Sequence, residues 1–168
     1  PDIDESILIP DNNPKQYCIS LAEMKTINIC QHYPDALVIG ADTIVALEDQ
    51  ILNKPANPKQ AEHMLEILSG KTHKVYTGVC LRWVENNIQH SFAGITWVTF
   101  RKLHKAEILH YIKTCTPYDK SGSYGIQDWS AIFVKNIQGC YDNVVGFPLS
   151  RFYQELKNLK INLLDSIS

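Results

Sequence analysis

The alternation of helical and extended patterns restricts the fold of this chain more than any other feature of its sequence. We expect helices at about 15–31, 58–69, 105–113 and from Pro148 onward, and extended runs at 36–41, 44–47, 74–84, 94–100 and 131–137. No internal repeat, low-complexity segment or composition shift interrupts this order. Alternation of this kind is typical of an α/β or α+β domain. We therefore expect one domain, with two lobes around a cleft as its organisation.

Size and composition exclude several classes of protein. The chain has 168 residues, 45% hydrophobic and 20% charged, so it can bury a core of its own. Its 16 basic and 18 acidic residues give a net charge of −2, which excludes a broad polybasic surface for nucleic acid. No stretch approaches the roughly 18 apolar residues of a membrane helix, and no signal peptide opens the sequence. The five cysteines are scattered without a C-x-x-C pair, so we expect a reducing cytoplasm and no structural zinc.

The helix expected at 15–31 carries a lysine on its apolar face. That face consists of Cys18, Leu21, Ala22 and Ile29. Lys25 stands seven residues after Cys18, where the helical period favours an apolar side chain. A lysine at this position either lies at the edge of the face with its ammonium in water or points toward an anionic group.

The extended run 36–41 leads into a carboxylate. The run is almost entirely apolar, as expected of a strand buried on both faces, and it ends in Asp42-Thr43. Ligands of open α/β sheets bind beyond the carboxyl ends of strands, so Asp42 is well placed for catalysis or for a metal. Aspartate is also common as the cap of a turn, and the local pattern leaves both interpretations open.

Charged residues elsewhere in the sequence suit a phosphate ligand. The lysines flanked by helix ends, turns or glycines are Lys25, Lys54, Lys71 and Lys120. A hairpin at 48–50 would return Lys54 to the neighbourhood of Asp42. The carboxylates available for a metal are Asp2, Asp4, Glu5 and Asp42. Mg²⁺ prefers one or two carboxylates together with phosphate oxygens, so this set favours a magnesium-bound phosphate ligand.

Other catalytic motifs are absent or incomplete. The run Gly70-Lys71-Thr72 matches the end of a P-loop, but position 65 is Leu where that motif has glycine, and a helix rather than a strand precedes it. The six histidines form no zinc-binding pattern, and no G-x-S-x-G serine nucleophile occurs. We interpret His73 as structural, because the sequence shows no partner for acid–base chemistry.

Two glycine-bounded loops add to the evidence for a nucleotide cleft. Residues 119–127 form a small-residue loop that lets the backbone approach a ligand closely. Its last residue, Gln127, has the paired donor and acceptor that can recognise the edge of a base. Residues 139–148 form a second loop that leads into a helix. Each loop alone is equally consistent with a turn, whereas the two together favour a nucleotide site.

In this order, these segments resemble the Maf (septum formation) family of nucleoside triphosphate pyrophosphatases. The matching stretches are 1–5 (PDIDE), 40–43 (GADT), 52–55 (LNKP), 68–75 (LSGKTHKV), 96–100 (TWVTF), 119–127 (DKSGSYGIQ) and 139–148 (GCYDNVVGFP). The likeness covers nearly the whole chain, so residues 1–168 are interpreted as a single domain of this family. The resemblance implies an α/β fold with a mixed sheet, in two lobes around a nucleotide cleft, and a homodimer.

The resemblance also implies a reaction: NTP + H₂O → NMP + pyrophosphate, with Mg²⁺ or Mn²⁺. Asp42 matches the family's catalytic aspartate, as a proton acceptor or a metal-organising carboxylate, and Glu5 is implied as a second metal ligand. Glu5, Lys25 and Lys54 match the other active-site positions. An aspartate with an ordinary pKa of about 4 is a weak base at pH 7, so metal positioning is the larger expected role of Asp42.

The selectivity positions of the family are also matched. Thr43 and Gln127 correspond to positions tied to the choice of base, and Lys71 and Lys120 are expected to contact the substrate. The Gly-Lys-Thr-His run at 70–73 and the Tyr-Gly-Ile-Gln run at 124–127 are similar to the branch that acts on dTTP and UTP.

The sequence departs from the family at its start. The family begins with a strand and a Ser-x-Ser-Pro-Arg-Arg loop that contacts the triphosphate, and neither precedes Pro1. Either an N-terminal segment precedes these residues or the protein is truncated, and because position 1 is not Met we expect the first. Two alternatives to a dTTP/UTP enzyme remain: a nucleotide-binding regulator of septation without catalysis, and a pyrophosphatase of the inosine triphosphate type.

Overall fold

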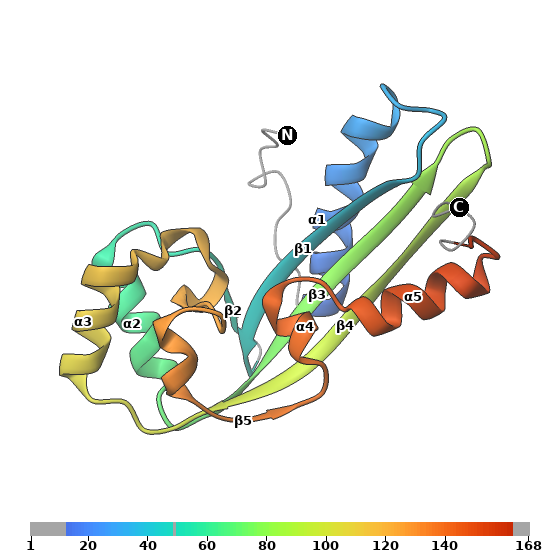
Figure 1. The fold of residues 1–168 in the computed structure, drawn as a ribbon. Coiled ribbons are helices and arrows are strands. Elements are labelled where there is room, and N and C mark those ends of the chain that lie inside the picture. The colour runs from blue at the N-terminus through green and yellow to red at the C-terminus, as the bar shows by residue number, and fades with distance from the viewer. Residues whose placement is uncertain (1–12, 49, 163–168) are drawn as a thin grey trace.

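The computed structural model describes residues 13–48 and 50–162, which fold around one antiparallel sheet (Figure 1). The strands are β1 (Val38–Leu47), β2 (Gln50–Leu52), β3 (Thr72–Trp83), β4 (Ile88–Phe100) and β5 (Val134–Gln138). Their order in the sheet is β2-β1-β3-β4-β5, and every pairing between these described strands is antiparallel. Consecutive strands therefore need only hairpins or short connections, except where helices are inserted.

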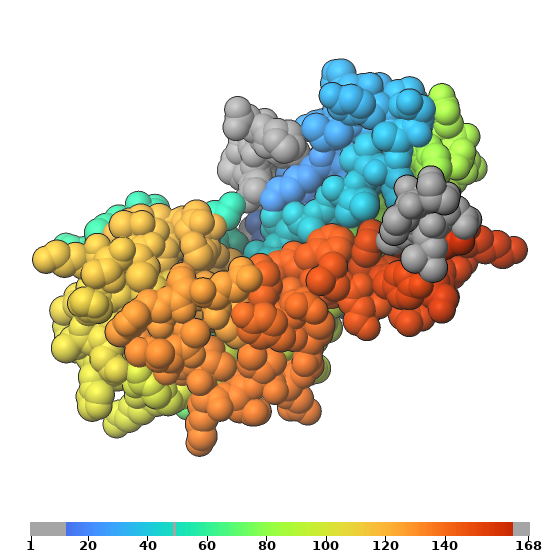
Figure 2. Space-filling model, in the orientation of Figure 1, coloured from blue at the N-terminus to red at the C-terminus, as the bar shows by residue number. Residues whose placement is uncertain are grey.

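The helices divide between two lobes. They are α1 (Pro14–Cys30), α2 (Pro58–Leu68), α3 (Lys105–Cys115), α4 (Tyr141–Val145) and α5 (Leu149–Asn158). The described 3₁₀ turns are η2 (Pro117–Asp119), η3 (Ser121–Ser123) and η4 (Trp129–Phe133). Helix α1 covers one face of the long strands and α4 and α5 lie against the other, while α2, α3 and the 3₁₀ turns gather at one end of the sheet (Figure 1). Figure 2 shows this second lobe as a separate mass beside the first. The expected α/β class and two-lobed organisation are confirmed, whereas the described strands form an antiparallel sheet where a mixed one was expected, because hairpins and short connections join its neighbours.

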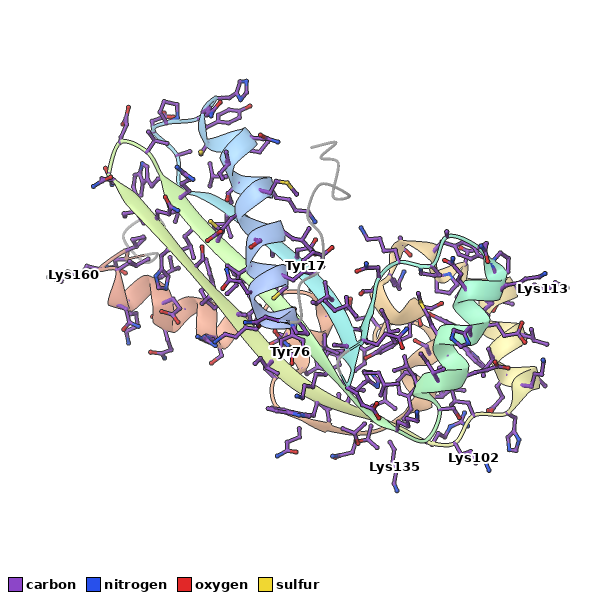
Figure 3. All side chains as sticks on the ribbon, turned by 180° about the vertical axis from the view of Figure 1, so that it is seen from behind. Tyr17, Tyr76, Lys102, Lys113, Lys135 and Lys160 are labelled. Atoms are coloured by element: carbon purple, nitrogen blue, oxygen red, sulfur yellow. The ribbon has the colours of Figure 1, made fainter. Side chains whose placement is uncertain are left out.

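Alternation along β1 sends neighbouring side chains to opposite faces of the sheet. Ile44 and Ala46 pack with Tyr17 of α1 and Tyr76 of β3, which Figure 3 labels. By the same alternation Asp42 faces α1, while Thr43 faces the side that α4 and α5 cover. The side chains of these two neighbouring residues therefore point to opposite faces of the sheet.

Helix α2 forms as the sequence predicts. The side-chain oxygen of Asn57 accepts a hydrogen bond from the backbone N–H of Gln60 at 3.0 Å, which satisfies one of the free donors of the first turn. Pro58 occupies the first turn, where its missing N–H costs nothing. Gly70, just beyond the helix, has a φ of 72°, a conformation that glycine adopts without strain.

Two predictions about strands are wrong in detail. The run 36–41 does not end at Asp42, because β1 continues through Asp42 and Thr43 to Leu47, paired with β3 over Val38–Ala46. Residues 131–137 are not one strand, since η4 covers the first of them before β5 begins. There the carboxylate of Asp128 accepts a hydrogen bond from the backbone N–H of Ser130 at 2.8 Å and starts a helical turn.

Candidate active site

A cavity of about 590 Å³ lies between the two lobes, beside one edge of β1. Strand β2 pairs only with Val45–Leu47, so residues 38–44 have no described strand partner on that side. The residues that line the cavity are Ala41, Asp42, Thr43, Val45, Lys54, Val75, Cys115, Asp119, Lys120, Ser121, Tyr124, Gly125, Ile126, Gln127, Asp128, Val144 and Val145. Both lobes contribute, and acidic, basic and amide side chains converge on one space.

An ion pair between α1 and β1 stands at one wall of this cavity. The Lys25 ammonium donates to the Asp42 carboxylate, and the side chains are 23% and 11% exposed. The lysine on the apolar face of α1 therefore points toward an anionic group, the second of the two interpretations that the sequence leaves open. The pair is largely shielded from water, so the two side chains hold each other in place at the cavity wall.

The approach of α1 to the sheet depends on Gly78 of β3. Gly78 pairs with Asp42 in the sheet register. A Cβ atom at this position would lie 2.2 Å from the backbone oxygen of Cys18 on α1. Only glycine lets the two backbones come this close, and the closeness places Lys25 within reach of Asp42.

The loop from Asp119 to Asp128 forms the opposite wall, and Ser121 fastens it to the sheet. The Ser121 hydroxyl accepts from the backbone N–H of Val45 at 3.0 Å and donates to the carbonyl of Leu52 at 2.6 Å. These bonds join the loop to the ends of β1 and β2. The loop is thereby held across the same strand that carries Asp42.

Charges at the loop lie close to one another. The Lys120 ammonium donates to both carboxylate oxygens of Asp119, at 2.8 and 3.1 Å. This hydrogen bond and, to a lesser extent, the charge of Lys54 hold the pKa of Asp119 below its usual value. The cavity therefore has two cationic side chains from different segments, Lys54 and Lys120, in addition to the lysine that pairs with Asp42.

Most of the predicted site residues lie together. Asp42, Thr43, Lys54, Lys120 and Gln127 all line the cavity, and Lys25 contacts it through Asp42. Lys71 is exposed just before β3 and does not line the cavity, whereas Glu5 lies outside the described residues.

Asp42 reaches the cavity in a way that differs from the expectation. The rule that ligands bind beyond the carboxyl ends of strands applies to parallel sheets. Asp42 instead lies in the middle of an antiparallel strand, at an edge of β1 where no described strand pairs with it, and it lines the cavity there.

Sequence reasoning missed several lining residues. Tyr124 is buried, and its hydroxyl lies 2.8 Å from Nε2 of His73, so the structural interpretation of His73 agrees with its packing. Asp128 accepts hydrogen bonds from Tyr111 and Ser130, which shape the loop. Cys115 reaches the cavity from the end of α3. The sequence has no local signal for these contacts, since each joins segments whose proximity depends on the tertiary fold.

The acidic residues at the cavity are compatible with a divalent cation that a phosphate ligand helps to hold. The described residues contain no group of three or more His, Cys, Asp or Glu side chains arranged to bind a metal. Mg²⁺ needs only one or two carboxylates when phosphate oxygens and water complete its octahedron. Asp42, a carboxylate at the cavity wall, fits such a site.

Comparisons with known proteins agree on one family. Residues 1–159 match the family model described as "Maf-like protein". Over 152 residues the chain is 45% identical to the dTTP/UTP pyrophosphatase of Bacillus cereus strain ATCC 14579, covering 90% of this chain and 78% of that protein. It is 43% identical over 145 residues to the dTTP/UTP pyrophosphatase of Carboxydothermus hydrogenoformans, with 86% and 78% covered.

Proposed function

This chain belongs to the family of Maf-like proteins, and from that membership and the geometry of its cavity we propose that it hydrolyses dTTP and UTP to the monophosphate and pyrophosphate. One structural observation supports the proposal above the others. The Lys25–Asp42 pair opens onto the same cavity as Thr43 and Gln127. Groups suited to a polyphosphate and groups suited to a base therefore share one space of nucleotide size.

The lysines serve the phosphate end of the substrate. Lys54 and Lys120 line the cavity, and Lys25 is held at its wall by Asp42. Hydrolysis releases pyrophosphate, so negative charge accumulates on the leaving group in the transition state. Cations that are already in position stabilise this charge without reorganisation, which is the main source of catalysis in such reactions.

Asp42 organises the attack of water rather than acting mainly as a strong base. Its carboxylate is held by the ion pair with Lys25, and an aspartate with an ordinary pKa of about 4 is a good hydrogen-bond acceptor and cation ligand but a weak base at pH 7. In the reaction, a water oxygen forms a bond to the α-phosphorus as the bond from that phosphorus to the bridging oxygen of pyrophosphate breaks. The carboxylate orients the water, whose proton passes to solvent or to the departing oxygen.

Mg²⁺ or Mn²⁺ completes the site in this proposal. Asp42 would hold the ion, with Glu5 as the second expected ligand outside the described residues. When bound, the ion neutralises charge on the phosphates and lowers the barrier to departure of pyrophosphate.

Release of pyrophosphate from a panel of nucleotides tests the proposal. The panel contains the common NTPs and dNTPs, ITP and 7-methyl-GTP, each with Mg²⁺, with Mn²⁺ and with a chelator. We expect turnover of dTTP and UTP that stops when the metal is removed. Asp42→Asn should lower kcat/KM by about 100-fold or more, because the carboxylate charge is lost.

Asp35→Asn is the matched control, since Asp35 is exposed in the turn before β1 and the substitution makes the same change of charge. Its activity should equal that of the wild type. Binding of dTTP without hydrolysis of any nucleotide would instead favour the nucleotide-binding regulator of septation. Preference for ITP would favour the inosine triphosphate type of pyrophosphatase.

We also propose that the protein acts as a homodimer in the cytoplasm, on free nucleotides, without a nucleic acid or membrane partner. The resemblance to the family supports the dimer. The net charge of −2 supports the absence of nucleic acid as a partner. Among the described residues, no helix combines the length and the apolar character needed to cross a bilayer.

A further inference from the structure

A chain of buried hydrogen bonds leads from Thr43, at the cavity, into the core behind it. The hydroxyl oxygens of Thr43 and Thr77 lie 2.9 Å apart. The Thr77 hydroxyl lies 2.8 Å from the backbone carbonyl of Asn143 on α4 and donates to it. Thr77 and Asn143 are both fully buried, so water does not compete for these bonds.

The proton positions in this chain follow from counting donors. A hydroxyl has one proton, and a backbone carbonyl can only accept. The proton of Thr77 is used on the Asn143 carbonyl, so Thr77 can only accept from Thr43. Thr43 must therefore donate its own proton to Thr77, away from the cavity.

The carbonyl at the end of the chain is itself held in place. The Asn143 side-chain amide donates to the carbonyl of Val75 at 3.1 Å and to the hydroxyl of Thr96 at 3.2 Å. Thr96 donates its proton to the carbonyl of Cys140 at 2.9 Å, so toward Asn143 it can only accept. The orientation of the amide is thereby defined, and Asn143 is fastened to both β3 and β4.

We propose that Thr77 and Asn143 are positioning residues that make Thr43 an obligatory hydrogen-bond acceptor toward the base. With its proton turned inward, the Thr43 hydroxyl offers only lone pairs to the cavity. Such a group matches a base with a ring N–H, as at N3 of uracil and thymine, and opposes cytosine, whose N3 is itself an acceptor. The proposal rests on the proposed function and explains how the site would discriminate uracil and thymine nucleotides from cytosine nucleotides.

Removing the Thr77 hydroxyl tests the proposal. In Thr77→Val the shape is nearly kept, but Thr43 loses its acceptor and its hydroxyl can rotate to donate into the cavity. We measure kcat/KM for UTP and CTP, and for dTTP and dCTP, on the same preparation of each full-length variant. The ratio UTP:CTP should fall by about three- to tenfold, the value of one neutral hydrogen bond. Because both substrates meet the same folded molecules, the ratio is independent of any loss of stability.

Two further variants separate this role from a structural one. Thr77→Ser retains the hydroxyl and should restore the wild-type ratio. Thr99→Val is the matched control, because Thr99 of β4 forms a hydroxyl pair with Thr72 of β3 at 2.8 Å in the same sheet but lines no part of the cavity. It should leave the ratio unchanged.

The outcomes distinguish this proposal from the proposed function. A wild-type protein that hydrolyses neither UTP nor dTTP overturns the proposed function, and this proposal with it. A wild-type protein that prefers UTP, with the same UTP:CTP ratio in Thr77→Val, overturns only the role of the hydroxyl chain. An equal loss of activity on all four nucleotides would likewise show that Thr77 is structural alone.

Discussion

At the scale of the residue, burial decides what the polar side chains of this protein can do. Lys25 and Asp42 are held together where little water reaches them, so each restricts the position of the other. Thr77 is buried and donates its proton to the Asn143 carbonyl, which can only accept. The same residue types on an exposed loop would exchange partners with water, and no chemistry could be assigned to them.

The titration of His73 provides a test at this scale. Its side chain is 1% exposed, and burial lowers its pKa to about 4 from an ordinary value of 6.5. Between these values the unfolded chain binds a proton that the folded chain does not. The contribution of His73 to the free energy of unfolding should therefore be fully present above pH 6.5. It should be lost as the pH falls toward 4, which lowers the free energy of unfolding by up to about 3 kcal/mol.

Urea unfolding of the wild type and of His73→Gln between pH 7.5 and 4.5 measures this contribution. Glutamine does not titrate, and its amide can still bond to the Tyr124 hydroxyl. The carboxylates titrate in both proteins, so they cancel in the difference. Parallel curves for the two proteins would contradict the assignment of a neutral, buried His73.

At the scale of the element, the packing of α1 against the sheet and the attachment of the loop 119–128 determine the geometry of the site. Gly78 brings the backbone of α1 against β3, and Ser121 ties the loop 119–128 to β1 and β2. The two walls of the cavity are thus positioned by contacts that involve no catalytic group. We expect changes at these contacts to alter catalysis through the distance between elements.

Gly78→Ala tests this expectation. The added Cβ would meet the backbone of Cys18, so α1 must shift away from the sheet and carry Lys25 from Asp42. We expect a loss of about 1–3 kcal/mol in the free energy of unfolding, and a lower kcat/KM per folded molecule. Denaturant unfolding and nucleotide turnover on the same samples measure both quantities.

Gly70→Ala is the matched control for this variant. Its positive φ makes alanine unfavourable by about 1 kcal/mol, but the nearest atom to the added Cβ is 4.0 Å away. It should lose stability and keep its kcat/KM per folded molecule. Equal kinetic losses in the two variants would mean that the approach of α1 does not control the site.

At the scale of the whole molecule, the cavity exists because two lobes share one sheet. Its walls come from residues 41–54, from 115–128 and from α4, which are far apart in the sequence and meet only in the folded chain. Closure or opening of such a space depends on how rigidly the lobes are joined. In this fold the connection is made by the continuous strands β3 and β4, which extend from one lobe to the other (Figure 1).

The proposed dimer is tested at the same scale. Sedimentation equilibrium of the purified chain should give a mass close to twice 19.1 kDa over a range of micromolar concentrations. Dissociation on dilution, followed together with turnover, would show whether activity requires the dimer. A mass of one chain at all concentrations, with full activity, would contradict the proposal.

The sequence alone determined the features of this protein that depend on local physical chemistry. The caps of α2 at Asn57 and Gly70, the α/β class and the lysine on the apolar face of α1 follow from neighbours three or four residues apart. Family motifs also identified Asp42, Thr43 and Gln127, which the structure places in one cavity.

Only the tertiary structure decided how these groups act. It joined Lys25 to Asp42, placed Asp42 within a continuous antiparallel strand, left Lys71 away from the cavity and turned the proton of Thr43 inward. Each of these depends on segments separated by tens of residues, and the sheet register and the packing of α1 and α4 bring them together. Local sequence patterns have no periodicity that encodes such distances, so the charge and proton arrangement of the site emerges only when the chain is folded.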